Sequence, residues 1–275
     1  MKRAKRTIVI LSLALAGCSG SIGPPAATPD VLSLHILTTP ATSALIQELA
    51  AEYAPRNAVF NLRSVTLSWD GIAQQLLAGQ ASYALTTHLP PVAGLWTAPI
   101  GYDALAIIVP SAMPVDALTL DQVRRLFQGQ IAAWDELGGP SLPVTVVVQE
   151  PGSDASQTFN AQVMGAQRVT LGARLALSSA SMVELVAQTP GAIGYVSIAA
   201  LENGVRAVPL RAENGPAVEL SRESVTGGDY PLRTPILVTG LSQPEEDSDF
   251  YAWFAWMQSP EGQAIISRRY AALHP

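Results

Sequence analysis

The sequence predicts an α/β protein. Short apolar runs rich in β-branched residues alternate along the chain with segments whose apolar residues recur at helical spacing. The 275 residues are enough to bury a large core, either in one domain or in two lobes. Ligands of α/β folds bind at the carboxyl ends of strands, so the loops that follow the strands are the first places to look for a site.

The elements follow one another in a regular order. Six apolar runs of strand length are expected at 31–37, 61–67, 104–109, 144–148, 192–196 and 235–239. Six segments with apolar residues at helical spacing lie at 41–53, 71–78, 119–127, 156–164, 181–187 and 250–273. Thr119 is a plausible N-cap of its helix, because its hydroxyl can accept a hydrogen bond from the first turn.

The first eighteen residues have the pattern of an export signal. A basic start is followed by a short apolar stretch and by small residues that end at Cys18, the chain's single cysteine. The stretch is too short for a transmembrane helix. Leu-Ala-Gly before Cys18 resembles a bacterial lipobox, which implies that Cys18 is acylated; the alternative is a stray cysteine in an ordinary signal. We therefore expect a signal peptide over 1–17, a Pro- and Gly-rich flexible tether over 18–30, and an exported protein lipid-anchored to the outer face of the cell membrane or to the periplasmic face.

Composition excludes several classes of function. The chain has 22 acidic and 16 basic residues, with no lysine after Lys5, which argues against a nucleic-acid partner. With Cys18 acylated there is no thiol left for a disulfide or a redox site. The three histidines have no metal-ligating partner at helical spacing, and no Gly-x-Ser-x-Gly elbow is present. We expect no enzyme, no cofactor and no metal.

Five stretches occur in the same order as in a known family. They resemble signatures of bacterial phosphate-binding proteins, the receptors of phosphate ABC transporters, and lie at 118–139, 150–153, 191–195, 230–233 and 259–263. The resemblance spans roughly residues 31–273. The resemblance implies a two-lobed type II periplasmic-binding-protein fold, the Venus-flytrap, in which each lobe is a mixed sheet flanked by helices. It places lobe 1 at 31–109 plus 229–275 and lobe 2 at 110–228.

The same resemblance implies a function. The chain would be a monomeric solute-binding lipoprotein of an ABC importer, with a membrane ABC permease as its partner, and would bind phosphate or a related oxyanion by closure of the two lobes. Four loops would face the cleft, at 38–42, 68–71, 82–87 and 149–156. Their candidate ligand-binding residues are Thr38, Thr39, Thr42, Ser68, Asp70, Ser82, Thr86, Gln149, Ser153 and Asp154. For the threonines, plain helix capping is the alternative role.

This chain departs from the family within those loops. Gln149 stands where phosphate receptors commonly have arginine, Ala155 replaces a threonine, and Ser82 stands where an aspartate accepts the proton of bound phosphate. Asp70 and Asp154 add carboxylates that would repel the anion if they pointed into the cleft, a direction that the sequence leaves open. We therefore expect weakened phosphate binding. Two alternatives remain, namely a receptor for a neutral or cationic small solute and a sensor or scaffold lipoprotein that does not transport.

Overall fold

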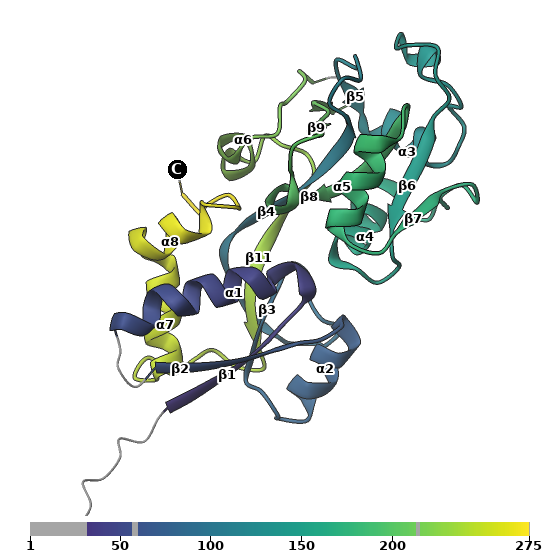
Figure 1. Cartoon of the computed structure of the whole chain (residues 1–275). Helices are drawn as coiled ribbons and strands as arrows, with labels where there is room; N and C mark the ends of the chain where they lie inside the picture. Colours follow the sequence, from purple (N-terminus) through teal and green to yellow (C-terminus); the bar gives the residue numbers. More distant parts are fainter. Residues whose placement is uncertain (1–31, 57–59, 213–214, 275) are drawn as a thin grey trace, which may run out of the picture. The chain divides into compact units, whose positions relative to one another are not determined.

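A mixed β-sheet organises the computed structural model, which describes residues 32–56, 60–212 and 215–274 (Figure 1). Among these residues the sheet path runs β2-β1-β3-β11-β4-β8-β6-β7, with β9 also paired to β4, while β5 and β10 form a separate pair. The strands are β1 (Leu32–Thr38), β2 (Phe60–Thr66), β3 (Tyr83–Thr86), β4 (Trp96–Pro110), β5 (Leu118–Thr119), β6 (Thr145–Gln149), β7 (Arg174–Ala176), β8 (Ala192–Ser197), β9 (Val205–Ala207), β10 (Leu210–Arg211) and β11 (Arg233–Gly240). The predicted signal peptide, the tether and Cys18 lie outside the described residues.

Helices connect these strands and cover the sheet. The α-helices are α1 (Pro40–Tyr53), α2 (Trp69–Leu77), α3 (Leu120–Phe127), α4 (Asp154–Phe159), α5 (Ser179–Gln188), α6 (Arg222–Gly227), α7 (Asp249–Gln258) and α8 (Pro260–Ile266). Shorter helical turns are η1 (Ala54–Arg56), η2 (Trp134–Leu137), η3 (Asn160–Met164, a π turn) and η4 (Ile198–Ala200).

Strand direction divides the sheet into two parallel groups joined by antiparallel strands. β1 runs parallel to both β2 and β3, and β6 runs parallel to both β7 and β8. Between the groups, β11 pairs antiparallel with β3 and β4, and β4 pairs antiparallel with β8. The strands of each parallel group therefore have their carboxyl ends at the same edge, and the loops that follow them lead into helices.

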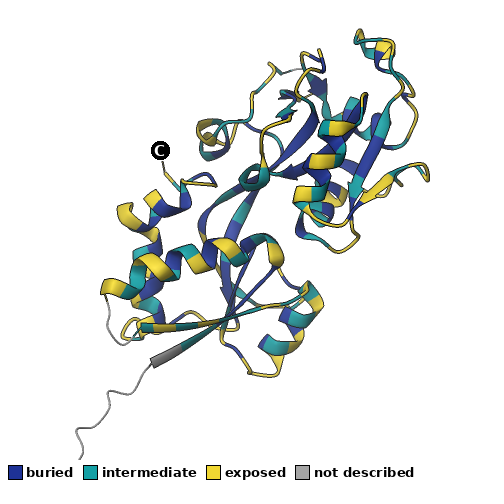
Figure 2. Cartoon of the chain, in the orientation of Figure 1, coloured by how far each residue is buried: buried dark blue, intermediate teal, exposed yellow. Residues whose placement is uncertain are grey.

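The middle of β4 is buried on both faces, which explains its uninterrupted apolar run. Leu105, Ile107 and Val109 pack in one cluster with α3 and η3, whereas Ala106 and Ile108 pack in another with α5. Successive side chains of a strand point to opposite faces, so helices on both sides remove every one of these residues from water. Figure 2 shows the central strands β4 and β8 mostly in the buried colour and the outer faces of the helices in the exposed colour.

The sheet around β1 is covered in the same way. Ile36 packs with residues of α1, α7 and α8, and Leu37 packs with Ile72 and Leu76 of α2. Burying a side chain of this size contributes about 1.5–3 kcal/mol. The alternation along β1 therefore places one helix layer on each face and holds the carboxyl end of the strand in a fixed position.

The fold-class prediction of α/β is confirmed, and several element boundaries differ from the sequence-based ones. All six predicted strands exist, but β4 begins at Trp96 rather than at residue 104. Thr119 caps α3 as predicted, with its hydroxyl accepting from the Gln122 amide at 3.1 Å. The single helix predicted over 250–273 is two helices, because Ser259 ends α7 and Pro260 begins α8. The predicted helix over 156–164 is α4 followed by the π turn.

The side-chain packing changes partners before the first predicted lobe boundary and after the second. Ala104 and Leu105 already belong to the cluster of the middle segment, as do Tyr230 and Leu232, while Ile236 belongs to the cluster of α1, α7 and α8. The changes in packing thus fall between residues 100 and 104 and between residues 232 and 236, whereas the sequence placed the crossings near 110 and 228. The cause is the length of β4, a single strand that serves both parts of the sheet.

Candidate functional site

A cavity of about 660 Å³ lies where the carboxyl ends of the two parallel strand groups face each other. The turns that leave β1, β2, β6 and β7 each enter a helix, and the first turns of α1, α4 and α5, together with the N-cap Ser68 of α2, supply lining residues. The middle of β4 and the first residues of β11 complete the lining through Asp103 and Thr234. The cavity therefore occupies the position at which α/β folds bind ligands.

One wall of the cavity is built around Gln149, the last residue of β6. Its side chain is only 5% exposed, and its amide nitrogen donates to the Ser179 hydroxyl at 3.3 Å. Its amide oxygen accepts from the Ser153 hydroxyl at 3.2 Å, and its backbone N–H donates to the Tyr195 hydroxyl at 3.2 Å. Two of these bonds, with Ser153 and Ser179, fix the orientation of the side-chain amide, and the third holds the backbone against β8.

The amino ends of α4 and α5 also belong to this wall. Ser153 and Ser178 are the N-cap residues of these helices, and both line the cavity. The unpaired N–H groups and the dipole at a helix N-terminus favour negative charge. We call Gln149, Ser153, Ser178 and Ser179 the donor wall.

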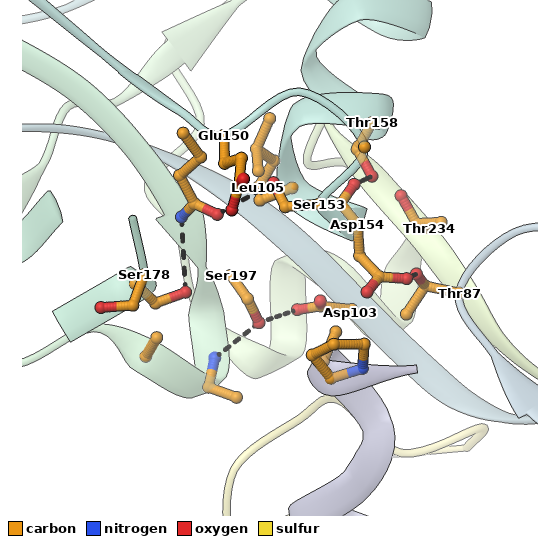
Figure 3. A pocket seen from close by; sticks show the side chains of 18 of the residues that line it. Thr87, Asp103, Leu105, Glu150, Ser153, Asp154, Thr158, Ser178, Ser197 and Thr234 are labelled. Carbon is orange, nitrogen blue, oxygen red and sulfur yellow. Dashed lines mark hydrogen bonds between the residues drawn. The ribbon is translucent and has the colours of Figure 1, made fainter. Parts of the chain in front are cut away.

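Two buried carboxylates also line the cavity, Asp154 and Asp103, each about 90% buried; Asp154 is the first residue of α4, directly after Ser153. One oxygen of Asp154 accepts from the Thr87 hydroxyl at 3.1 Å. Asp103 accepts from the Ser197 hydroxyl and from the Ala104 amide, each at 2.7 Å. We call Asp103, Asp154 and Thr87 the carboxylate wall; Figure 3 shows its side chains together, with Ser197 beside Asp103.

Burial shifts the pKa of Asp103 strongly. Loss of hydration raises its pKa from 3.8 to about 6, against the lowering effect of the hydrogen bonds from Ser197 and Ala104, and the charge of Asp154 raises it further. The shift corresponds to about 3 kcal/mol of preference for the protonated acid. Asp103 is thus held close to its titration point at neutral pH.

His88 joins the two parallel groups just outside the cavity lining. Its Nε2 lies 3.0 Å from the Thr158 hydroxyl of α4, and its Nδ1 lies 3.1 Å from the Thr87 hydroxyl. Its ring contacts Trp69 edge-on with centroids 4.9 Å apart. Burial lowers the pKa of His88, while the nearby Asp154 opposes that effect. A neutral imidazole is therefore favoured at this contact between the end of β3 and α4.

Positive charge is sparse in the described lining. Arg269 is its one cationic side chain, about half exposed, and its Nε pairs with Glu48 at 2.9 Å. The donor wall is therefore neutral apart from its helix dipoles, and the carboxylate wall has no cationic partner within the lining that the structure describes.

Four of the residues proposed from the sequence meet in this cavity, namely Ser68, Gln149, Ser153 and Asp154. The direction of Asp154, which the sequence left open, is into the cavity. Asp70 is exposed on the first turn of α2 and is absent from the lining.

The proposed threonines lie behind the cavity surface rather than on it. Thr38, Thr39 and Thr42 are fully buried, and their hydroxyls bond one another, with Thr38 and Thr42 only 2.7 Å apart. Thr42 also donates to the Leu85 carbonyl at 2.8 Å, which ties α1 to β3. Thr39 occupies the N-cap position without a side-chain capping bond, so the capping alternative is not observed either. Their neighbours Pro40 and Ala41 form the actual surface.

The expectation for the loop at 82–87 needs correction. Tyr83–Thr86 is the buried strand β3, not a loop. Ser82 is exposed at its amino end, whereas the cavity lies at the carboxyl end of β3, beyond Thr86. Thr86 is buried and donates to the His88 carbonyl at 2.6 Å. Thr87 is the residue of this segment that reaches the cavity.

Sequence reasoning missed several lining residues, including Asp103, Ser178, Ser179, Ser197 and Thr234. Asp103 carried a usable signal, because an acidic residue at the start of a long apolar run is rarely buried without a role. Ser178 could have been found as the N-cap three residues before the predicted helix at 181–187. Ser197 is the last residue of β8 and Thr234 the second of β11, and no local sequence pattern marks either position.

Two further searches cover the described residues only. No helix among them has the length and apolar character needed to cross a membrane. No group of three or more histidine, cysteine, aspartate or glutamate side chains in the described part of the chain is arranged to hold a metal ion.

Known proteins share this architecture. The chain aligns with the Phosphate-binding protein PstS of Bacillus subtilis (strain 168), 28% identical over 150 residues, covering 54% of this chain and 45% of the relative. It aligns with the Phosphate-binding protein PstS of Pseudomonas aeruginosa (strain PAO1) at 27% identity over 164 residues, covering 55% and 51%. The aligned segments thus span about half the length of these curated relatives.

Solved structures extend the comparison to nearly the whole described chain. An ABC-type phosphate transport receptor from Vibrio cholerae superposes with a TM-score of 0.74 at 23% identity, covering 86% of this chain and 99% of that one. A putative phosphate ABC transporter substrate-binding protein with bound phosphate from Clostridium perfringens gives 0.74 at 24% identity, covering 88% and 99%. These likenesses confirm the predicted two-lobed type II periplasmic-binding-protein fold.

A family model extends over most of the chain and assigns it to a family. The model, described as a PBP superfamily domain, matches residues 23–261. That span includes every element around the cavity from β1 to the start of α8. By this match the chain belongs to the PBP superfamily.

Proposed function

We propose that this protein is the exported substrate receptor of an ABC importer, that it binds phosphate or a related oxyanion, and that it carries no catalysis of its own. The observation that carries the proposal is the cavity at the strand ends, with the donor wall on one side. Relatives named phosphate-binding proteins supply the ligand class. An ABC permease in the membrane is the partner that such a receptor would serve.

The two walls suit an oxyanion that still carries a proton. The helix N-termini and the Gln149 amide donate to anionic oxygens, whereas a carboxylate can only accept. Phosphate near neutral pH keeps at least one proton and can donate it to Asp154 or Asp103. Sulfate is fully ionised and would face those carboxylates with repulsion alone. The receptor should therefore prefer phosphate over sulfate.

Calorimetric titration of the full chain, purified in a mild detergent, tests this proposal. Phosphate is expected to bind saturably, with a dissociation constant weaker than on the order of 1 μM because the arginine of the family is Gln149. Sulfate at the same concentrations is expected to give no saturable heat. Equal binding of the two anions, or none of phosphate at millimolar concentration, would overturn the proposal.

Lobe closure is the second part of the proposal. Thr87 and His88 follow β3, whereas their hydrogen-bond partners Asp154 and Thr158 belong to α4. These bonds span the two parts that we propose as lobes, so closure would strengthen them. Trp69 contacts His88, and its fluorescence should therefore change when phosphate is added. A spectrum unchanged at saturating phosphate would argue against closure at this contact.

Anchoring is the third part and rests on the sequence around Cys18. A Cys18→Ser chain expressed in a bacterial host is expected to leave the membrane fraction or to remain uncleaved, because the acylated residue is absent. The unchanged chain should fractionate with membranes and release a lipid-modified peptide on digestion. A processed, membrane-bound Cys18→Ser product would exclude the lipid anchor.

A second candidate function is a receptor for a neutral or cationic solute. It is favoured by the carboxylate wall together with the neutral Gln149. The titration above separates the two candidates, because such a receptor would show no phosphate binding, while a panel of small amines and polyols would raise the melting temperature.

A further inference from the structure

The cavity has two chemically opposite ends. The donor wall offers amide and hydroxyl hydrogens with the N-terminus of α5, and the carboxylate wall offers Asp103 and Asp154, the latter being the first residue of α4. Figure 3 shows Ser178 on one side of the cavity and Asp154 with Thr87 on the other, with Ser197 and Asp103 between them. An anion without a positive group can accept hydrogen bonds from the donor wall but is repelled by the carboxylate wall.

The carboxylates lack a cation within the described lining. Arg269, which is half exposed at the edge of the lining, is paired with Glu48, and the hydrogen bonds that reach Asp103 and Asp154 in the cavity come from neutral groups. Buried carboxylates are ordinarily paired with a cation or coordinate a metal. A positive charge on the ligand would complete this wall.

The size of the cavity also exceeds the needs of an inorganic oxyanion. About 660 Å³ lies in the range of sites that enclose small organic molecules. An inorganic phosphate held by the donor wall would leave the carboxylate wall facing water. A ligand that reaches both walls would use the whole space.

We propose that the natural ligand is a small zwitterionic phosphate or phosphonate monoester, whose phosphoryl group lies at the donor wall and whose primary ammonium lies between Asp103 and Asp154. This inference rests on the proposed function and names the class of oxyanion that the receptor carries. The ammonium has three donors for the carboxylate oxygens, and Thr87 and Ser197 hold those carboxylates in place.

The state of Asp103 agrees with this assignment. Its pKa is raised to about 6 mainly by burial. In the site without ligand, the ionised form of Asp103 is therefore destabilised by the loss of its hydration. An ammonium beside it favours the ionised form and removes that cost, whereas a second anion increases it. The carboxylate wall therefore distinguishes ligands by the sign of the group that reaches it.

A matched pair of ligands tests the proposal by calorimetry on the full chain in detergent. The probe is 2-aminoethyl phosphate, and its control is ethyl phosphate, which keeps the phosphoryl group and loses the amine. The aminoethyl ester is expected to bind about 10- to 100-fold more tightly, the range that a charge-assisted hydrogen bond supports. Inorganic phosphate should bind no better than ethyl phosphate.

Two variants locate the ammonium. In Asp154→Asn and in Asp103→Asn the advantage of the aminoethyl ester is expected to shrink at least tenfold, while ethyl phosphate binds as well or better. Asp249→Asn is the matched control, because Asp249 holds the same first position of α7, after a serine N-cap, and is exposed. It should leave the ratio of the two affinities unchanged. The two cavity variants act on separate elements, so a folding failure of one leaves the other as the test.

The outcomes separate this inference from the proposed function. Two results would overturn the zwitterionic ligand and leave a plain oxyanion receptor. One is equal affinity for the two esters, and the other is an affinity ratio of the two esters that stays the same in both cavity variants. Binding of ethanolamine without any phosphoryl compound would overturn both. Glycerophosphoethanolamine, the diester of a lipid headgroup, is a further probe. Tighter binding of this diester than of 2-aminoethyl phosphate would overturn the assignment to a free monoester.

Discussion

Gln149 shows at the scale of one residue how this site differs from the phosphate receptors that the sequence resembles. An arginine at this position would bring a positive charge into the cavity, while the glutamine brings a neutral amide fixed by Ser153 and Ser179. The fixed amide orients a donor at small entropic cost but adds no net charge. The electrostatic balance of the cavity is consequently set by Asp103 and Asp154.

Restoring the arginine should therefore strengthen phosphate binding. Gln149→Arg is expected to tighten phosphate binding by about 10-fold or more, because a charge-assisted bond replaces a neutral one. Ser82→Asp, which would imitate the other family residue, should change nothing, because Ser82 lies at the far end of β3. Calorimetric titration of the two variants measures both effects. Tighter phosphate binding by the Ser82 variant would contradict the placement of the cavity.

Asp103 should make stability depend on pH in a predictable direction. Its pKa is about 6 in the folded chain and near 3.8 when unfolded, so the folded state holds the proton more strongly. Its contribution is fully present below about pH 4 and is lost as pH rises through 6. The free energy of unfolding of Asp103→Asn, relative to the unchanged chain, should rise by about 3 kcal/mol between pH 4 and pH 7.5.

Urea titrations at several pH values measure this difference, because other groups titrate alike in both chains and cancel. A difference that falls with rising pH would show that Asp103 is stabilised as an anion in the folded state.

The sequence located residues of the cavity lining where local chemistry marks a position. Ser68 and Ser153 stand in turns between a strand and a helix, and Gln149 ends the strand before such a turn; the pattern of apolar residues locates these places well. Ser82 lies away from the cavity because a shift of a few residues along β3 moves a side chain to the other end of the strand. Thr38 and Thr42 lie behind the cavity surface, and the sequence does not show that their hydroxyls bond each other.

At the scale of elements, the turn into β8 depends on a glycine that also has no room for a side chain. Gly191 has a φ of +72°, and a Cβ added there would lie 2.2 Å from the Pro143 carbonyl oxygen. Its own carbonyl accepts from the Trp134 indole N–H and from the Thr145 amide, both at 2.9 Å. The turn thus joins β6, β8 and the buried Trp134 at one point.

Gly191→Ala should therefore lower the free energy of unfolding by more than about 3 kcal/mol, through strain at positive φ and through displacement of Pro143. Gly79→Ala is the matched comparison, since Gly79 has a φ of +66° with no atom within 4 Å of the added Cβ. It should cost about 1–2 kcal/mol, the strain alone. Urea unfolding midpoints of the two variants measure the difference, and equal losses would mean that Pro143 moves aside freely.

Element boundaries were predictable only where a periodic pattern was long. The apolar run at 104–109 is conspicuous because both of its faces are buried, while the preceding half of β4 alternates in burial and was missed. β5, β7, β9 and β10 have two or three residues each, too few for any periodicity to show. The break between α7 and α8 was marked by Pro260, which fits the first turn of a helix but not its interior.

For the whole molecule, the order of elements predicted the α/β class, and the family resemblance supplied the two-lobed fold. The lobe limits remain a proposal, and the packing suggests where a separable unit begins. The Leu105 amide donates to the Leu232 carbonyl at 2.8 Å, and the residues of β4 from Leu105 onward pair with β8. A fragment that starts after β4 would lack the strand at the centre of its own sheet.

Residues 104–232 are accordingly expected to fold alone, whereas residues 111–225 are not. The longer fragment keeps the carboxyl half of β4 together with Tyr230 and Leu232, which are fully buried in its cluster. Cooperative urea unfolding, followed by circular dichroism, distinguishes the two fragments. Cooperative unfolding of the shorter fragment would show that β4 is dispensable for that part of the chain.

The position of β11 has a consequence for biosynthesis. β3 and β4 follow each other along the chain, yet β11, made from residues 233–240, lies between them and pairs with both. A nascent chain emerges amino end first, so both strands leave the ribosome with open edges that wait for a partner encoded more than a hundred residues later. Unpaired strand edges recruit other chains, which makes this interval the one most exposed to aggregation. Translation stalled before residue 233 would prolong that interval. A synthetic peptide with the sequence of β11 would specifically reduce the aggregation by pairing with the open edges of β3 and β4.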